Sequence, residues 1–223
     1  MASKYVLALS SSPRRKGNSR VLTEALVEGA AEAGHRTELV HLPDYVTGML
    51  RNCRECRRAD GSCSIDDKFP ELFFDKFLKC DALVVATPIW WYGMSAHLKN
   101  FFDRWFCYFA ASYPGTADVH RQIYRKRLAL VLSAEENNLP ARMGILHSIS
   151  EVSRYMHWTM VGCVTGIGNS TGETRKDPLN PVAEARALGR RHFEVEETDY
   201  KGDTPRDPHV WKEGNRSFPT SWR

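Results

Sequence analysis

The sequence has no long hydrophobic run, and this absence excludes the simplest kind of membrane protein. Nowhere in its 223 residues do apolar side chains follow one another for about 18 positions, the length a transmembrane helix needs. The N-terminus also lacks the separate charged, apolar and small-residue regions of a secretory signal, because Met1–Lys4 leads directly into a strand-like run. We therefore expect no membrane partner and a cytoplasmic location.

An excess of one charge sign is also missing. The chain has 31 Lys and Arg against 27 Asp and Glu, a net charge of +4, and its basic residues are scattered along the sequence. A nucleic-acid partner would require basic side chains gathered on one face, so none is expected. Apolar residues make up 42% of the chain, enough to build the core of one large domain with, at most, a small appendage.

The two familiar glycine-rich nucleotide motifs are absent as well. Gly17 is followed by Asn18, which excludes a GxxxxGK[ST] loop, and Gly166-x-Gly168 has the wrong spacing for GxGxxG. A hydroxyl-rich basic loop, Ser10–Ser19, stands instead between an apolar run and a helical segment. Hydroxyls, backbone N–H groups and the positive end of a helix are the groups that hold a phosphate.

This loop therefore predicts a phosphate site. Its candidate ligands are Ser10, Ser12, Arg14, Asn18 and Ser19. Arg14 is suited to the task because a guanidinium can bind a phosphate with two parallel hydrogen bonds. An ordinary polar turn that caps the helix is the alternative, and the density of hydroxyls favours the phosphate.

Apolar runs alternate with helical patterns along most of the chain. The expected strands are 5–9, 37–42, 81–87, 128–132 and 160–167, and the expected helices are 18–33 (capped by Asn18 or Ser19), 68–79, 95–109, 139–158 and 180–195. This alternation predicts a doubly wound parallel α/β sheet in a domain of residues 1–195, with 110–126 as a polar connection. The remaining tail, 196–223, is polar and aperiodic; its four aromatic residues either dock on the body or a partner subunit, or belong to a loose end.

Three strands end in unusual loops, at 10–19, 87–94 and 133–138. Ligands of parallel sheets bind beyond the carboxyl ends of the strands, so we expect these loops to share one edge. The second loop carries Trp90, Trp91 and Tyr92 in succession, and its position after a strand favours a ligand wall over core packing.

Together the first two loops resemble the flavodoxin-like NAD(P)H-dependent FMN reductases, a group that includes iron–sulfur flavoproteins and multimeric quinone reductases. That family holds the FMN phosphate with a Gly-Ser-Pro-Arg-x-x-Gly-Asn-Ser/Thr loop. Ser11–Ser19 matches this loop except that Ser11 replaces the first glycine. Residues 87–104 match the family's second signature almost throughout, with Trp90 where tyrosine is usual.

The resemblance implies a flavodoxin-like five-stranded parallel sheet of order 2-1-3-4-5, with helices on both faces. It implies FMN as cofactor, NAD(P)H as electron donor, a homodimer or homotetramer, and a small acceptor such as a quinone, a nitro or azo compound, or a flavin. No catalytic side chain is expected, because FMN carries the chemistry. The residues implied for FMN, besides the five of the first loop, are Pro88, Ile89, Trp90, Trp91, Tyr92, Gly93, Ser133 and Glu135.

Three other functions remain open: an electron-transfer flavoprotein, an iron–sulfur flavoprotein, and a flavin-dependent tailoring enzyme that acts on one specific metabolite. Small electron carriers tend to be strongly acidic, whereas this chain has a pI of about 8.7. Iron–sulfur relatives carry four clustered cysteines; this chain has Cys53, Cys56 and Cys63, with Ala59 at the third position. We expect no metal here and favour a structural remnant, although a metal site or a redox disulfide stays an alternative.

Overall fold

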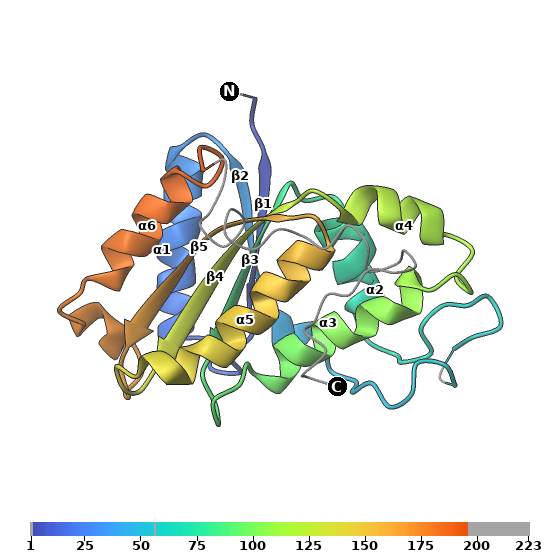
Figure 1. The fold of residues 1–223 in the computed structure, drawn as a ribbon, viewed down its shortest axis with the longest axis horizontal. Coiled ribbons are helices and arrows are strands. Elements are labelled where there is room, and N and C mark those ends of the chain that lie inside the picture. The colour runs from blue at the N-terminus through green and yellow to red at the C-terminus, as the bar shows by residue number, and fades with distance from the viewer. Residues whose placement is uncertain (1, 56, 196–223) are drawn as a thin grey trace, which may run out of the picture.

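The computed structural model describes residues 2–55 and 57–195, so the tail at 196–223 lies outside the described residues. Five parallel strands form one sheet in the order β2-β1-β3-β4-β5, which confirms the expected flavodoxin-like topology (Figure 1). The strands are β1 (Tyr5–Ser10), β2 (Arg36–His41), β3 (Ala82–Pro88), β4 (Arg127–Ala134) and β5 (Thr159–Ile167).

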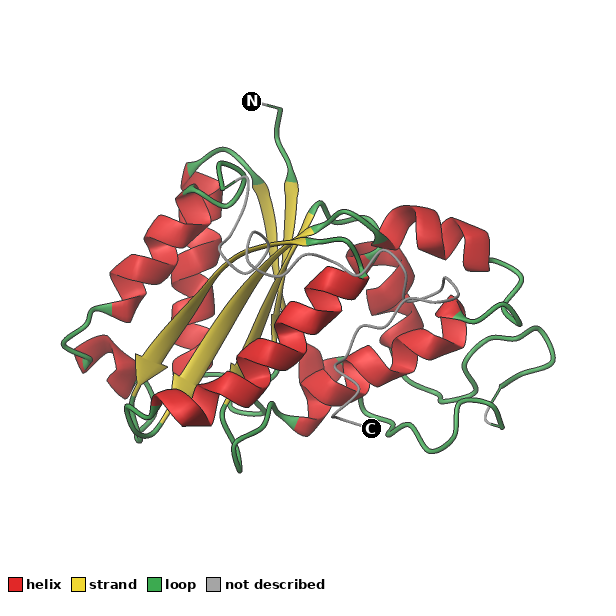
Figure 2. Ribbon diagram, in the orientation of Figure 1, coloured by secondary structure: helices red, strands yellow, loops and turns green. Residues whose placement is uncertain are grey.

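Helices cover both faces of this sheet (Figure 2). On one face lie α1 (Asn18–Glu32) and α6 (Pro181–Arg190); on the other lie α3 (Ala96–Phe109) and α5 (Leu139–Tyr155), with α2 (Phe69–Glu71) and α4 (Thr116–Ile123) beyond α3. Three short segments complete the described chain: η1 (Leu42–Asp44), η2 (Leu72–Phe77) and η3 (Glu173–Lys176). Within the described ranges, no helix combines the length and apolar character needed to cross a membrane.

Several predicted boundaries are wrong. The helix expected at 68–79 divides into α2 and a π-helical turn, η2. The connection expected at 110–126 contains α4, which was missed because only Val119 and Ile123 of its eight residues are buried, too few to form a periodic pattern. The last two long helices end at Tyr155 and Arg190, before the predicted positions 158 and 195.

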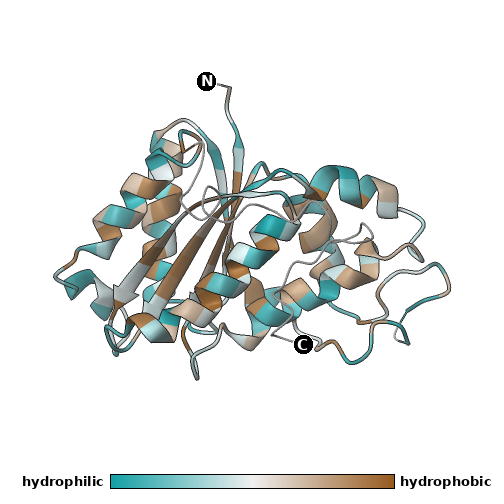
Figure 3. Cartoon of the chain, in the orientation of Figure 1, coloured by the Kyte–Doolittle hydropathy of each residue, from teal (hydrophilic) through white to brown (hydrophobic). Residues whose placement is uncertain are grey.

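The two faces of the sheet differ in side-chain size. Along β1, Leu7 and Leu9 pack with the layer that contains α3 and α5, whereas Val6 and Ala8 pack with α1 and α6. The other central strands, β3 and β4, alternate in the same way, so all three strands are apolar on both faces. Figure 3 shows the central strands mainly in the brown of hydrophobic residues. The small residues on the α1 side allow these helices to lie close to the sheet.

Glycines let α1 and α6 approach each other as well. A Cβ atom added at Gly29 of α1 would lie 2.0 Å from the Arg186 carbonyl oxygen, and one added at Gly189 of α6 would lie 2.0 Å from that of Leu26. Arg186 then bridges Glu28 and Glu32 across the same contact. This contact matters for function because α1 begins in the predicted phosphate loop.

We predict that Gly29→Ala destabilises the protein by about 2 kcal/mol, because overpacking at the helix contact outweighs the better helix propensity of alanine. Urea unfolding followed by circular dichroism measures this. Gly144→Ala in α5 is the matched control: its nearest neighbour would be the Tyr92 carbonyl oxygen at 3.8 Å, so its stability should stay level or rise. Equal losses at the two positions would contradict the close α1–α6 contact.

Candidate active site

The three predicted loops meet at the carboxyl edge of the sheet, as expected, and enclose a polar cleft of about 180 Å³. The loop after β5 forms its fourth wall. The cleft is lined by Ser12, Arg14, Gly17, Asn18, Ser19, Pro88, Ile89, Trp90, Ser133, Ala134, Glu135, Gly168 and Asn169. Nine of the thirteen residues implied for FMN are therefore adjacent in space: Ser12, Arg14, Asn18, Ser19, Pro88, Ile89, Trp90, Ser133 and Glu135.

The N-terminus of α1 opens into this cleft without a side-chain cap. The prediction of Asn18 or Ser19 as N-cap is wrong, because Gly17 occupies that position and no side chain bonds the helix end. The first intrahelical bond runs from Val21 N to Gly17 O, so the N–H groups of the three preceding residues have no partner in the helix. The Ser19 hydroxyl is buried and has no hydrogen-bond partner among the described residues. An anion would satisfy both deficits.

The two neighbouring arginines of the loop behave differently. Arg15 forms a bidentate ion pair with Asp44 of η1, with Nη2–oxygen distances of 2.6 and 2.9 Å. Arg14 contributes only backbone bonds, from its N–H to Ser12 Oγ and from its carbonyl to Gly17 N–H. Its exposed side chain lines the cleft and, within the described ranges, takes part in no ion pair. Arg14 is thus the arginine that remains available to a ligand.

Asn18 fastens the fourth wall. Its Nδ2 donates to the carbonyl oxygens of Gly168 (2.7 Å) and Ser170 (3.0 Å), and its Oδ1 accepts from Thr174 N (3.3 Å). The side chain is therefore occupied within the protein, which leaves its backbone N–H for a ligand. Gly168 and Asn169 were not predicted; their place after the fifth strand, where the carboxyl-edge rule also applies, was the signal that could have found them.

Buried hydroxyls join the first loop to the second. Ser11 Oγ donates to Ala86 O (2.8 Å), and Ser95 Oγ lies 2.7 Å from Ser11 Oγ. Ser95 N donates to Thr87 Oγ1 (2.9 Å), and Ser95 Oγ also caps α3 by accepting from Leu98 N. Ser11, which stands in place of the family's glycine, thus supplies a hydroxyl bridge that glycine could not form.

We predict a coupling free energy of about 1 kcal/mol between Ser11 and Ser95 in a double-mutant cycle of their alanine variants. Each single substitution removes the bond between the two hydroxyls, so the second substitution has no such bond left to remove and should cost less in the variant background than alone. Urea unfolding of the four proteins gives the value. Ser148→Ala, which removes an exposed bond to Gly144 O, is the control and should change stability little; additive single effects would show that the bridge is not formed.

The second loop is a tight hairpin. Trp90 and Gly93 exchange two backbone bonds of 3.0 Å, and the two residues between them have positive φ, 47° for Trp91 and 61° for Tyr92, as a type I′ turn requires. Ile89 N donates to Ser133 O (2.8 Å). The N–H groups of Ile89, Trp90 and Gly93 are therefore already bonded within the protein.

A second cavity of about 430 Å³ adjoins the cleft and shares three lining residues with it, Ile89, Ala134 and Glu135. Trp91 and Tyr92 line this cavity rather than the cleft. The remaining two predicted residues line neither space: Ser10 is fully buried at the end of β1 with no partner for its hydroxyl in the described part of the chain, and the partly exposed Gly93 closes the hairpin.

A buried ion pair holds the cysteine-containing loop against α3. Arg104 donates to both oxygens of Asp67, at 2.5 and 2.8 Å, and the side chains of both residues are at most 1% exposed. Burial acts to raise the pKa of Asp67, but the bonds from Arg104, Gly48 N and Phe69 N outweigh it and keep the pKa below its usual value. Asp103, the neighbour of Arg104 in the sequence, pairs with Lys99.

Arginines also contact the thiols of this loop. Arg57 lies 3.7 Å from Cys53 Sγ, and Arg104 lies 3.6 Å from Cys63 Sγ. A hydrogen bond with the Cys107 thiol of α3, together with Arg104, lowers the pKa of the Cys63 thiol, whereas burial acts to raise it. Among the described residues, which exclude Cys56, no group of three or more His, Cys, Asp or Glu side chains is arranged to hold a metal ion.

The geometry of the cleft fits a phosphorylated flavin on three counts: an uncapped helix end, an unpaired buried hydroxyl at Ser19 and an available arginine. The family profile of the NADPH-dependent FMN reductases matches residues 5–171. The chain belongs to this family. It is an NAD(P)H-dependent FMN oxidoreductase whose cofactors are FMN and NAD(P)H.

Individual relatives extend this assignment. YwqN of Bacillus subtilis, named as an NAD(P)H-dependent FMN-containing oxidoreductase, is 26% identical over 185 residues, 83% of this chain and 97% of that protein. An iron–sulfur flavoprotein of Methanocaldococcus jannaschii is 32% identical over 99 residues, 44% of this chain and 50% of that protein. The solved structure of an NAD(P)H:quinone oxidoreductase from Methanothermobacter marburgensis is 25% identical, with a TM-score of 0.57, and the match covers 85% of this chain and 96% of that one.

Proposed function

We propose that this FMN oxidoreductase transfers a hydride from NAD(P)H to a small acceptor, a quinone, a nitro or azo compound, or a flavin. The observation that carries the proposal is the open cavity beside the cleft, which provides room for a second molecule next to the cofactor. The similarity to a quinone oxidoreductase supports a quinone as one acceptor. FMN, when bound, supplies a ring that accepts a hydride and can release its electrons singly or in pairs.

The residues of the cleft divide between the two ends of FMN in this proposal. Ser12, Arg14, Ser19 and the N–H groups at the start of α1 hold the phosphate. Pro88–Trp90 and Ser133–Glu135, which line the cleft side by side, would hold the ring and exclude water from it. Ser10 and Gly93 support the two loops from behind, without contact to the cofactor.

Purified protein should oxidise NAD(P)H in the presence of a quinone, with FMN that bleaches under anaerobic NADH or NADPH. The acceptor reaction is balanced as NAD(P)H, a proton and quinone giving NAD(P)⁺ and hydroquinone. Stopped-flow absorbance of the flavin, followed by steady-state oxidation of each donor, tests both halves. Bleaching without quinone turnover would leave an electron carrier for protein partners as the better description.

The double variant Ser12→Ala/Arg14→Ala should lose FMN by roughly 100-fold in affinity, because two phosphate ligands disappear, one of them a charge-assisted bidentate donor. Fluorescence of released flavin during dialysis measures the dissociation constant. Arg15→Ala is the matched control, since that neighbouring guanidinium is engaged with Asp44 and should matter little. Equal losses in the two proteins would indicate a general effect of loop charge.

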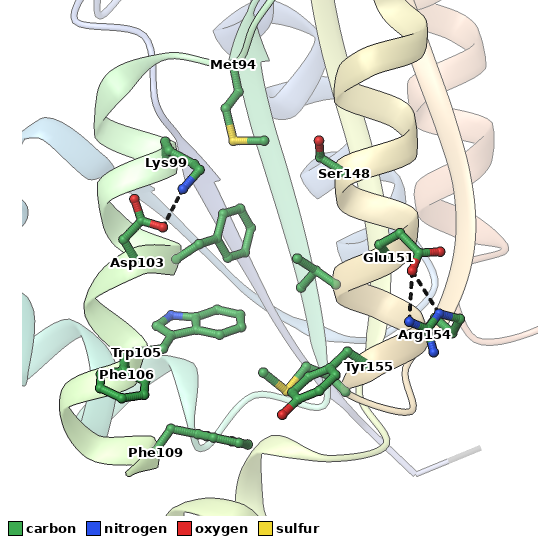
Figure 4. Close-up of a pocket in the computed structure, with 13 residues that line it drawn as sticks. Met94, Lys99, Asp103, Trp105, Phe106, Phe109, Ser148, Glu151, Arg154 and Tyr155 are labelled. Atoms are coloured by element: carbon green, nitrogen blue, oxygen red, sulfur yellow. Dashed lines mark hydrogen bonds and ion pairs between the residues drawn. The ribbon is translucent and has the colours of Figure 1, made fainter. Parts of the chain in front are cut away.

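A homodimer or homotetramer is also part of the proposal, supported by an apolar groove of about 500 Å³ between α3 and α5 (Figure 4). Phe106 and Tyr155, each 46% exposed, flank it. The charged residues along the groove are paired with one another, Lys99 with Asp103 and Glu151 with Arg154, so the lining carries no net charge. Aromatic side chains of this kind are enriched where subunits meet.

Phe106→Glu should shift the protein toward a monomer in size-exclusion chromatography with light scattering, because it places a charge in the apolar contact. Leu179→Glu is the control, as Leu179 is 71% exposed and does not line the groove. An unchanged oligomer in the Phe106 variant would place the subunit contact elsewhere.

A cytoplasmic location completes the proposal. The five described cysteines are free thiols, four of them buried, which agrees with a reducing compartment.

A further inference from the structure

The cavity beside the cleft has an unusual lining, and its chemistry suggests which acceptors it selects. The inference rests on the proposed function, since the cavity is taken as the acceptor's place. Ile89, Ala134 and Glu135 belong to both spaces, so a molecule in the cavity lies directly against whatever fills the cleft.

One wall of the cavity is aromatic. Trp91 is 96% exposed and Tyr92 is 65% exposed, and the hairpin turn presents both of them from the end of β3. Flat aromatic molecules can stack on such rings, and the faces of tryptophan and tyrosine also attract positive charge. This wall therefore favours a planar ring and, near it, a cation.

Two carboxylates, Glu135 and Glu136, also line the cavity. None of the ion pairs found within the described part of the chain involves either of them. Within the described residues, the bond found to the Glu136 carboxylate is a 3.3 Å bond from Asn138 Nδ2. The basic side chain of the same segment, Arg142, is bonded to Asn137 Oδ1 and does not line the cavity. The cavity thus holds negative charge that the described residues do not neutralise.

We propose that this cavity selects planar aromatic acceptors that carry a positive charge, and disfavours anionic acceptors with the same ring. The cation lies between the aromatic wall and the carboxylates, where it gains from both. The charged substituent takes no part in the reaction: a quinone acceptor still gains two electrons and two protons, a hydride originating from NAD(P)H and a proton from water.

Matched ligands test the selection without turnover. Two naphthalenes with an ethyl side chain, ending in trimethylammonium in one and in sulfonate in the other, are titrated into the FMN-loaded protein by calorimetry. We expect about tenfold tighter binding of the cation, the size given by one cation–π contact and two partly screened carboxylates. The corresponding 1,4-naphthoquinones, whose ring potentials match because the charge is on the side chain, should show the same ratio in kcat/KM.

Two double variants locate the effect. Glu135→Gln/Glu136→Gln should reduce the preference for the cation to about twofold, and Trp91→Ala should reduce it in part. Glu55→Gln/Glu194→Gln changes the net charge equally but acts away from the cavity: Glu55 lies in the cysteine-containing loop, and Glu194 follows α6 near the amino ends of the strands. This control should keep the full preference.

Equal affinities for the two naphthalenes in the parent protein would overturn the inference, as would a preference that the control pair removes and the cavity pair does not. Failure of the proposed function looks different. Flavin content and bleaching by NAD(P)H are recorded on each sample, so a protein that retains no FMN rejects the proposed function, whereas one that bleaches but does not discriminate rejects only the charge selection.

Discussion

The geometry of this site depends on the 2.7 Å hydrogen bond between the hydroxyls of Ser11 and Ser95, which connects the first loop to the start of α3. The phosphate loop and the hairpin loop leave the neighbouring strands β1 and β3, whose pairing ends at Ser10 and Ala86. Ser11 is anchored to β3 through Ala86 O, and Ser95 begins α3. Because the bridge is buried, water does not compete for it, and the two loops hold their spacing before any ligand arrives.

Neighbouring residues of the phosphate loop have separate tasks. Arg15 fixes the outside of the loop to η1, and Asn18 fixes the inside to the segment after β5. With both ends restrained, Arg14 and Ser19 keep polar groups directed to the cleft without partners of their own. A ligand then meets donors that are already in position, which lowers the entropy cost of binding.

The fold could be predicted because the central strands are nearly continuous apolar runs, and Ala82–Ala86 fits no other assignment in an α/β pattern. The meeting of the loops followed from the parallel topology. The N-cap prediction was wrong because it concerned a side chain whose hydrogen-bond partners lie far away in the sequence. Asn18 has the residue type of a helix cap, but its amide reaches Gly168, 150 positions away. Spacing along the chain contains no record of such contacts.

The hairpin at Trp91 and Tyr92 has a consequence for evolution. Both residues hold positive φ, a region that glycine and asparagine enter at little cost and that bulky side chains enter only with strain. An Asn-Gly pair would suit this turn better and make a more stable protein. It would also remove the aromatic wall of the cavity. The hairpin turn is thus less stable than it could be. Selection for thermostability alone would replace Trp91 and Tyr92, the side chains that we propose help to select the acceptor.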